Sequence, residues 1–315
     1  MHNLDAVYEN NYNAHRQVQS PDNMGIGLCF LMNQNLSKGD SFELLLETIV
    51  YADELGFSFA CIIDENKHDH SGIKLNPTII HSALSVRTSR IALRGECLPP
   101  DRRDAIRSVE DWSVVDNLSN GRIGIMMPSG SDQMPFGDLM EKHVSELRGL
   151  WKGDAVKRIN GLGNEVELKI FPRPVQEELP IWVLLTEIHE ELSFIKAGEL
   201  GFHILTPSGK ENNPLWLDRI EKYRKAVSSS LHLKEKGKVT LLADLYEDEM
   251  SVQNENEQSV AAVPENILSA FYEHIKIAGN DADEVAFRID LAWGKEYIFS
   301  KLESLAICLK SMNVI

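Results

Sequence analysis

Apolar and polar positions follow two alternating periods along most of the chain after residue 24. Short apolar runs of strand length recur, and between them lie segments whose apolar residues are spaced as in amphipathic helices. The runs of strand length are residues 26–31, 57–63, 91–97, 122–127, 181–186, 203–205 and 239–245. Helical spacing occupies 42–55, a segment from Pro77, 104–118, 139–151, 189–198, 214–229, 263–277 and 296–313. Strands apolar on both faces and separated by helices predict a parallel sheet covered by helices, and about seven strands favour a (β/α)₈ TIM-like barrel.

Two segments depart from this rhythm. Residues 1–24 are polar and aperiodic, so they are predicted to be an N-terminal extension, with one barrel domain over residues 25–315. Residues 160–178 combine glycines, a short apolar alternation and two prolines. This composition predicts a β-excursion inserted in the barrel.

Charge and cysteine content exclude several classes of protein. The 32 Lys and Arg residues stand against 48 Asp and Glu, a net charge of −16, which opposes binding to nucleic acid or to an anionic membrane. The apolar runs are far too short to cross a bilayer. The four cysteines lack metal-binding or disulfide-framework spacing, which fits free thiols in the cytoplasm.

The ends of the predicted strands define one mouth of the barrel, where such folds bind ligands. A ligand is expected there beside seven residues: Glu65, Cys97, Met127, Ser129, Gly130, Thr186 and Thr206. Three of these residues have plainer interpretations, since Cys97 fits a buried inert thiol and Ser129-Gly130 fits an ordinary turn.

A few nearby residues suggest chemistry without defining it. His68 could act as a general base, and His68 with His70 could bind a metal, although an exposed polar loop accounts for both. Arg103, with Arg102 and Arg107, could bind phosphate, or could belong to a charged helix start. Spacing alone does not reveal the reaction.

Longer strings carry a family resemblance. Residues 109–125, VEDWSVVDNLSNGRIGI, resemble the helix–turn–strand signature of luciferase-like, flavin-dependent monooxygenases. Residues 160–176, NGLGNEVELKIFPRPVQ, are similar to the branch of that family found in natural-product biosynthesis. Shorter strings at 55–57, 76–77, 179–182 and 197–201 extend the resemblance from about residue 25 to the C-terminus.

The resemblance implies an FMN-dependent monooxygenase of specialised metabolism. Reduced FMN from a separate flavin reductase and O₂ would oxygenate a small-molecule or carrier-bound substrate. The family often dimerises through helices on one side of the barrel, which implies a homodimer or a heterodimer with a homologue. Glu65 matches the family's acidic residue after the second strand.

Departures from the family pattern support an alternative. Asn66 and Lys67 replace the usual His and leave His68 displaced, while Ser131-Asp132 replaces an aromatic residue and a second His. The loop after Phe136 is shortened and lacks an Arg for the flavin phosphate, a role that Arg103 could take. The chain also ends where relatives enter the eighth strand, so an incomplete or altered last strand is expected. A non-catalytic subunit paired with a catalytic homologue, or a flavin- or ligand-binding protein without turnover, is therefore the alternative.

Overall fold

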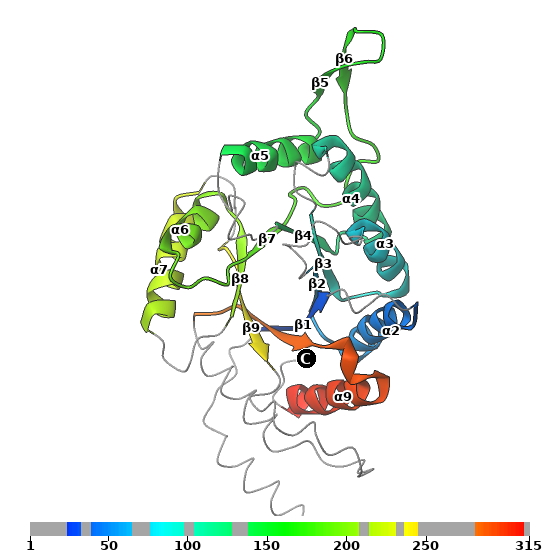
Figure 1. The fold of residues 1–315 in the computed structure, drawn as a ribbon, viewed down its shortest axis with the longest axis vertical. Helices are drawn as coiled ribbons and strands as arrows, with labels where there is room; N and C mark the ends of the chain where they lie inside the picture. The colour runs from blue at the N-terminus through cyan, green and yellow to red at the C-terminus, as the bar shows by residue number, and fades with distance from the viewer. Residues whose placement is uncertain are drawn as a thin grey trace, which may run out of the picture.

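Eight parallel strands close into a barrel in the computed structural model of this chain (Figure 1). The structure describes residues 24–32, 39–64, 76–97, 104–127, 138–207, 214–230, 236–244 and 281–311. Around the barrel the strands follow the order β1, β10, β9, β8, β7, β4, β3 and β2. Their bounds are β1 Gly25–Met32, β2 Phe59–Asp64, β3 Ala92–Glu96, β4 Ile123–Met127, β7 Ile181–Leu184, β8 His203–Pro207, β9 Val239–Asp244 and β10 Glu284–Ile289. The predicted TIM-like barrel is confirmed.

Helices surround the barrel and cover its outer face (Figure 1). They are α2 Gly39–Leu55, α3 Pro77–Arg87, α4 Ala105–Ser119, α5 Asp138–Lys152, α6 Glu191–Glu199, α7 Pro214–Ser228, the 3₁₀ helix η3 Leu291–Trp293 and α9 Lys295–Ser311. Local sequence fixes several of their ends. The side chain of Asn76 caps α3 and that of Asp104 caps α4, which ends at Asn120 in the left-handed conformation. The predicted helix at 263–277 lies outside the described residues, as does the predicted extension apart from Met24.

Strand β10 corrects the expectation of an incomplete barrel. It pairs with β1 from Gly25 opposite Glu284 to Phe30 opposite Ile289, and with β9 on its other side. Two charged residues, Glu284 and Arg288, interrupt its apolar run and hid it from the sequence pattern. The strand lies before the final helix, so the barrel needs no segment beyond that helix to close.

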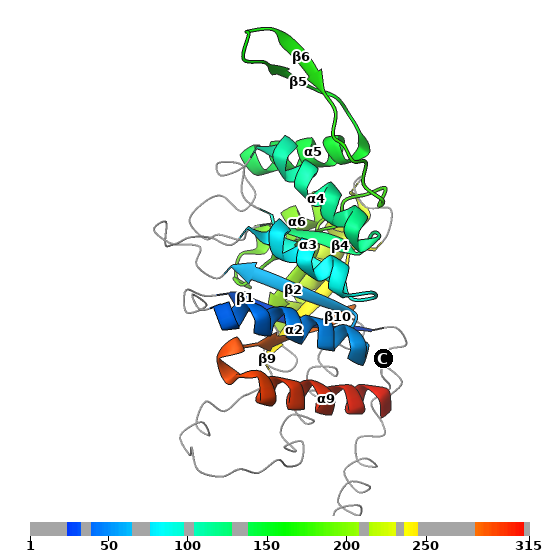
Figure 2. The ribbon, with the colours of Figure 1, turned by 90° about the vertical axis from the view of Figure 1, so that its right-hand side faces the viewer.

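The predicted β-excursion is a two-stranded antiparallel hairpin. Strands β5 (Val156–Ile159) and β6 (Glu165–Leu168) pair from Val156 opposite Leu168 to Ile159 opposite Glu165, starting slightly earlier than predicted. Figures 1 and 2 show the hairpin standing away from the barrel, beyond α4 and α5.

Side chains alternate along each barrel strand between a helix-facing core and the barrel interior. The interior cluster contains Cys29, Phe59, Cys61, Ile63, Met126, Trp182, Leu184, Leu205, Leu242 and Ala286. All are buried, so the barrel is a packed core and not a pore. Its two ends are built differently, and this difference locates the candidate site.

Candidate functional site at the C-terminal mouth of the barrel

The N-terminal end of the barrel interior is closed by a buried ion pair. Arg94 of β3 donates two parallel hydrogen bonds to Glu284 of β10, at 2.7 and 2.8 Å, and both side chains are about 95% buried. Thr240 and Lys238 donate further hydrogen bonds to the same carboxylate, at 2.7 and 3.0 Å. Burial opposes ionisation of Glu284, but the Arg94 guanidinium outweighs it, so the pKa of Glu284 falls to about 2.

Aromatic rings seal the space around this ion pair. The Arg94 guanidinium lies 3.9 Å from the Phe59 ring centroid and 4.1 Å from that of Trp182. Trp182 fits here because Gly124 faces it, and a Cβ at that position would lie 2.4 Å from the indole. His203 packs on Trp182 and its Nδ1 accepts the Lys238 backbone N–H. Burial, with the nearby Arg94 charge, lowers the pKa of His203 to about 3.

The C-terminal end of the interior has an apolar floor. Ile63, Leu184 and Leu242 face inward from β2, β7 and β9, and Leu31 of β1 packs against them. Below this level Cys29, Cys61 and Ala286 are no more than 1% exposed, so a ligand entering from the mouth has to stop at the floor. The floor is therefore the base of the candidate site.

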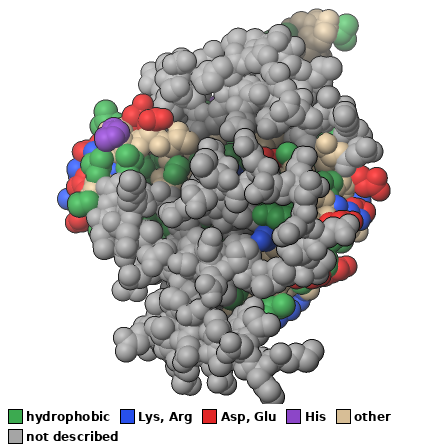
Figure 3. Space-filling view, turned by 60° about the horizontal axis from the view of Figure 1, so that its bottom comes forward, with side chains coloured by type: hydrophobic (Ala, Val, Ile, Leu, Met, Phe, Trp, Pro, Cys, Tyr) green, Lys and Arg blue, Asp and Glu red, His purple; other side chains and the backbone are tan. Residues whose placement is uncertain are grey.

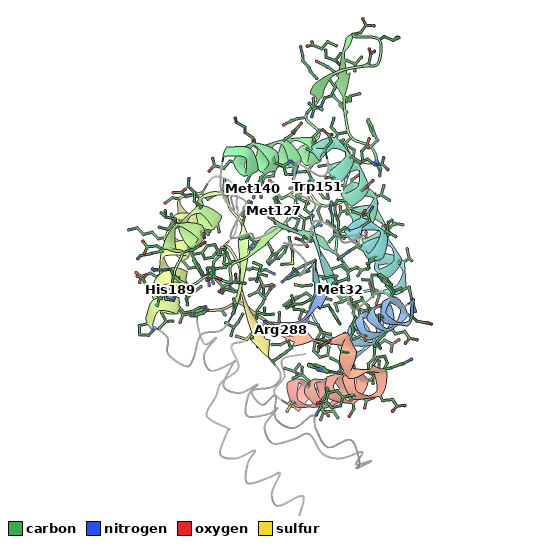
Figure 4. The ribbon with its side chains drawn as sticks, viewed as in Figure 1. Met32, Met127, Met140, Trp151, His189 and Arg288 are labelled. Carbon is green, nitrogen blue, oxygen red and sulfur yellow. The ribbon has the colours of Figure 1, made fainter. Side chains whose placement is uncertain are left out.

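Charged and polar side chains frame the floor. Strand alternation directs Glu96, the last residue of β3, and Arg288 of β10 toward the interior, and both are partly exposed. Arg288 is in register with Asp244 on β9. Thr186 is exposed two residues beyond the end of β7, in phase with the inward-facing Trp182 and Leu184. Figure 4 marks the position of Arg288 on β10. The mouth thus offers hydrogen-bond donors and acceptors above an apolar surface.

The predicted site residues that the structure describes do not all face the mouth of the barrel. Cys97 and Met127 lie at the mouth end of their strands, but both belong to the helix-facing core and are buried. Figure 4 shows Met127 with Met140 and Trp151 toward α5. Thr206 is buried and alternates with the inward-facing Leu205, so it too faces the helices. Of the predicted residues that the structure describes, only Thr186 is exposed at the mouth.

The remaining predicted residues, Glu65, His68, Arg103, Ser129 and Gly130, lie outside the described residues. Arg107, which the sequence grouped with Arg103, is described. It forms ion pairs with Glu110 and Asp111 on the exposed face of α4. Arg107 therefore belongs to the charged helix start that the sequence offered as the alternative to a phosphate site.

Sequence reasoning missed Glu96 and Arg288. A usable signal was present, because charged residues stand two apart in β3 (Arg94, Glu96) and four apart in β10 (Glu284, Arg288). Charges spaced by even numbers within a buried strand lie on one face, which in a barrel with a helix-covered exterior is the interior.

Two features are absent from the described part of the chain. It brings together no group of three or more His, Cys, Asp or Glu side chains suited to a metal ion. None of its helices combines the length and apolar character needed to cross a bilayer.

The family follows from comparison with known proteins. The family model described as luciferase-like monooxygenase matches residues 24–186, just over half of the chain. The chain belongs to the luciferase-like monooxygenase family. No curated protein sequence matches the chain significantly.

Solved structures share the fold at low sequence identity. Monooxygenase RslO1 from Streptomyces bottropensis is 18% identical over 92% of this chain and 100% of its own, with a TM-score of 0.69. The oxygenating constituent of 3,6-diketocamphane monooxygenase from Pseudomonas putida, solved with FMN, is 13% identical over 90% and 97%, with a TM-score of 0.65. The coenzyme F420-dependent tetrahydromethanopterin reductase from Methanopyrus kandleri is 13% identical over 89% and 97%, with a TM-score of 0.61.

Proposed function

We propose that this chain is an FMN-dependent monooxygenase that uses reduced flavin and O₂ in cytoplasmic specialised metabolism. A separate reductase supplies the reduced flavin, the substrate is a small molecule, free or carrier-bound, and the protein works as a dimer with itself or a homologue. The observation that carries the proposal is the apolar floor at the C-terminal mouth, framed by Glu96, Thr186 and Arg288.

The residues at the mouth fit the ring system of a flavin. Leu31, Ile63, Leu184 and Leu242 offer an apolar surface on which one face of a planar aromatic ring can rest. The Arg288 guanidinium would donate hydrogen bonds to the polar edge of the ring, and the Glu96 carboxylate would accept them. When bound, reduced flavin would supply two electrons, so that one atom of O₂ is transferred to the substrate and the other is reduced to water. The chain's own part is to hold the ring, and the packed interior below the floor excludes water from that side.

The alternative of a non-catalytic subunit loses one of its supports. It rested on a displaced His, a missing phosphate-binding Arg and a curtailed barrel, and β10 closes the barrel. The F420-dependent reductase among the structural relatives makes a deazaflavin the chemical competitor for the same floor. FMN is favoured here because the 160–176 string resembles FMN-dependent enzymes of natural-product biosynthesis.

Anaerobic titration with reduced FMN, and separately with reduced F420, tests the proposal. The wild-type chain is expected to bind reduced FMN, and Arg288→Met to bind it about 10–100-fold more weakly, since a hydrogen bond to a charged group contributes about 1.5–3 kcal/mol. Leu184→Arg, which places a charge on the floor, should weaken binding at least as much. Arg107→Met, on the exposed face of α4, is the matched control and should bind as the wild type does.

Three results would contradict the proposal. They are no binding of reduced FMN to the wild-type chain, equal binding by Arg288→Met and the wild type, or a preference for reduced F420. Binding of reduced FMN followed by conversion of O₂ to H₂O₂ alone, with no oxygenated product from any candidate substrate class, would instead favour the subunit without turnover.

A further inference from the structure

Arginine side chains tie several loops of the barrel to the helices or turns beside them. Arg122 and Arg148 donate to carbonyls of the loops that lead into β3 and β8, at the closed end of the barrel. Arg219 of α7 instead donates to the loop that leaves β7, at the mouth. Because ligands of such barrels bind at the C-terminal ends of the strands, a loop held there bears on binding as well as on stability.

The Arg219 side chain is enclosed between α7 and the start of α6. It is 91% buried. Its Nε donates to the Ile188 carbonyl at 3.1 Å, and its Nη1 donates to the Glu191 carboxylate at 2.8 Å. Ile188 belongs to the loop between β7 and α6, and Glu191 is the first residue of α6, which lies beside α7 (Figure 1). One side chain of α7 therefore holds both the loop and the helix that follows it.

A neighbouring lysine shows what Arg219 adds. Lys222 donates to the Glu191 and Asp218 carboxylates at 2.8 and 2.9 Å, and Arg219 forms ion pairs with the same two carboxylates. Figure 3 shows acidic and basic side chains together on the left flank of the molecule, where α6 and α7 lie. The side chains of Glu191, Asp218 and Lys222 are 36–43% exposed, so water screens their ion pairs. Of these two basic residues, Arg219 is the one that also reaches the Ile188 carbonyl.

Local sequence fixes the ends of this loop better than its middle. The N-cap side chains of α3 and α4 bond to the backbone, whereas that of Glu190, at the N-cap of α6, does not. The Leu185 N–H donates to the Leu205 carbonyl at 2.8 Å and extends the β7–β8 ladder. The Glu190 N–H donates to the Glu187 carbonyl at 3.0 Å and closes a turn around Ile188. The hydrogen bond from α7 then anchors this turn to the body of the protein.

We propose that Arg219 is a positioning residue for the flavin site, and that it holds Thr186 at the mouth through the Ile188 carbonyl. Thr186 is exposed beside the apolar floor and lies two residues before Ile188. Its hydroxyl can both donate and accept a hydrogen bond. Arg219 is buried between helices, so its effect on a ligand has to pass through the loop. The inference rests on the proposed function, because it names what sets the position of one group that faces the reduced flavin.

A double-mutant cycle, read by anaerobic titration with reduced FMN, tests this role. Arg219→Met should raise the dissociation constant about 3–30-fold, the range for a residue that acts from outside the binding contacts. Thr186→Val removes the hydroxyl and should weaken binding by a similar factor. In the Thr186→Val background Arg219→Met should have little further effect, because both changes act on the same contact. Lys222→Met is the matched control, since it removes ion pairs to the same two carboxylates and leaves the Ile188 bond, and it should bind as the wild type does.

Hydrogen exchange provides a readout that needs no flavin. Arg219→Met should speed exchange at the amides of residues 186–190 about tenfold or more, because the loop loses its bond to α7, whereas Lys222→Met should leave these amides unchanged. Circular dichroism and melting temperature show whether each variant is folded. If Arg219→Met does not fold, Arg219→Lys, which keeps a cation beside both carboxylates, takes its place in both experiments.

The outcomes separate this inference from the proposed function. Equal binding by Arg219→Met and the wild type, an equal loss for Lys222→Met, or additive effects of Arg219→Met and Thr186→Val would overturn the positioning role while leaving the flavin site in place. Unchanged exchange at residues 186–190 in Arg219→Met would overturn the anchoring of the loop. A wild-type chain that does not bind reduced FMN would overturn the proposed function, and the positioning of Thr186 for flavin with it.

Discussion

The two ends of the barrel interior use the same two strands in opposite ways. At the closed end β3 contributes Arg94 and β10 contributes Glu284, and these bond to each other within an aromatic enclosure. At the mouth β3 contributes Glu96 and β10 contributes Arg288, with the signs exchanged and both side chains partly exposed. The first pair is sealed off from any ligand. Glu96 and Arg288 stand where a ligand would arrive.

This difference separates stability from function along the barrel axis. Three residues donate four hydrogen bonds to the Glu284 carboxylate, so removing Arg94 takes away two of them and leaves the buried charge with Thr240 and Lys238 alone. Glu96 and Arg288 are only partly buried, so removing one of them leaves no fully buried charge. Substitutions at the closed end should therefore lower the free energy of unfolding, whereas substitutions at the mouth should change what the protein binds.

The largest effect is expected for Arg94→Met. It leaves Glu284 ionised and buried, and breaking a buried pair in this way costs about 3–5 kcal/mol of unfolding free energy. Urea denaturation measures the loss. The double variant Arg94→Met/Glu284→Leu, which removes both charges, should recover a large part of it. A loss below about 1 kcal/mol for the single variant would show that the closed end is not sealed in solution.

The sequence predicted the barrel itself better than it predicted which side chains face the barrel interior. Helix and strand alternate regularly, and each strand is apolar, so the architecture follows from periodicity. The same apolar character conceals which face of a strand points inward, because both faces are buried. The expectation that ligands bind at the C-terminal ends of the strands thus selected Cys97, Met127 and Thr206. These residues lie at that end of the barrel, but their side chains face the helices. Charged residues within a strand reveal which face points inward. In β10 the charged residues Glu284 and Arg288 also interrupted the apolar run by which strands are recognised.

The next effect is the pH dependence of stability, which the closed end should dominate. Unfolded His203 binds a proton below about pH 6.5, whereas folded His203 resists protonation down to about pH 3, so unfolding takes up a proton in this window. Stability therefore falls as the pH is lowered through it. Burial also lowers the pKa of His81 and of His143, so both residues add to the loss of stability at low pH. Glu284, with a folded pKa of about 2 against 4.5, adds its loss only below about pH 4.5.

His203→Gln isolates one of these protons. Between pH 6.5 and 4.5 the slope of unfolding free energy against pH should fall by about 1.4 kcal/mol per pH unit, the value for one proton. Urea titrations at several pH values give the slope. His189→Gln is the control, because it makes the same replacement at an exposed position two residues before α6 (Figure 4). Parallel curves for His203→Gln and the wild type would refute the enclosure of His203.

The smallest effect on stability is expected at the mouth, from Glu96→Gln. The substitution keeps the size of the side chain and removes one partly exposed charge, so the unfolding free energy should change by less than about 1 kcal/mol. If the Glu96 carboxylate accepts hydrogen bonds from the ring of reduced FMN, the amide accepts them more weakly, and affinity should fall about tenfold or more while the fold is unchanged. Anaerobic titration beside urea denaturation of the same sample separates the two quantities. A stability loss comparable to that of Arg94→Met would mean that Glu96 is as deeply enclosed as Arg94, and the two ends of the barrel would no longer differ in kind.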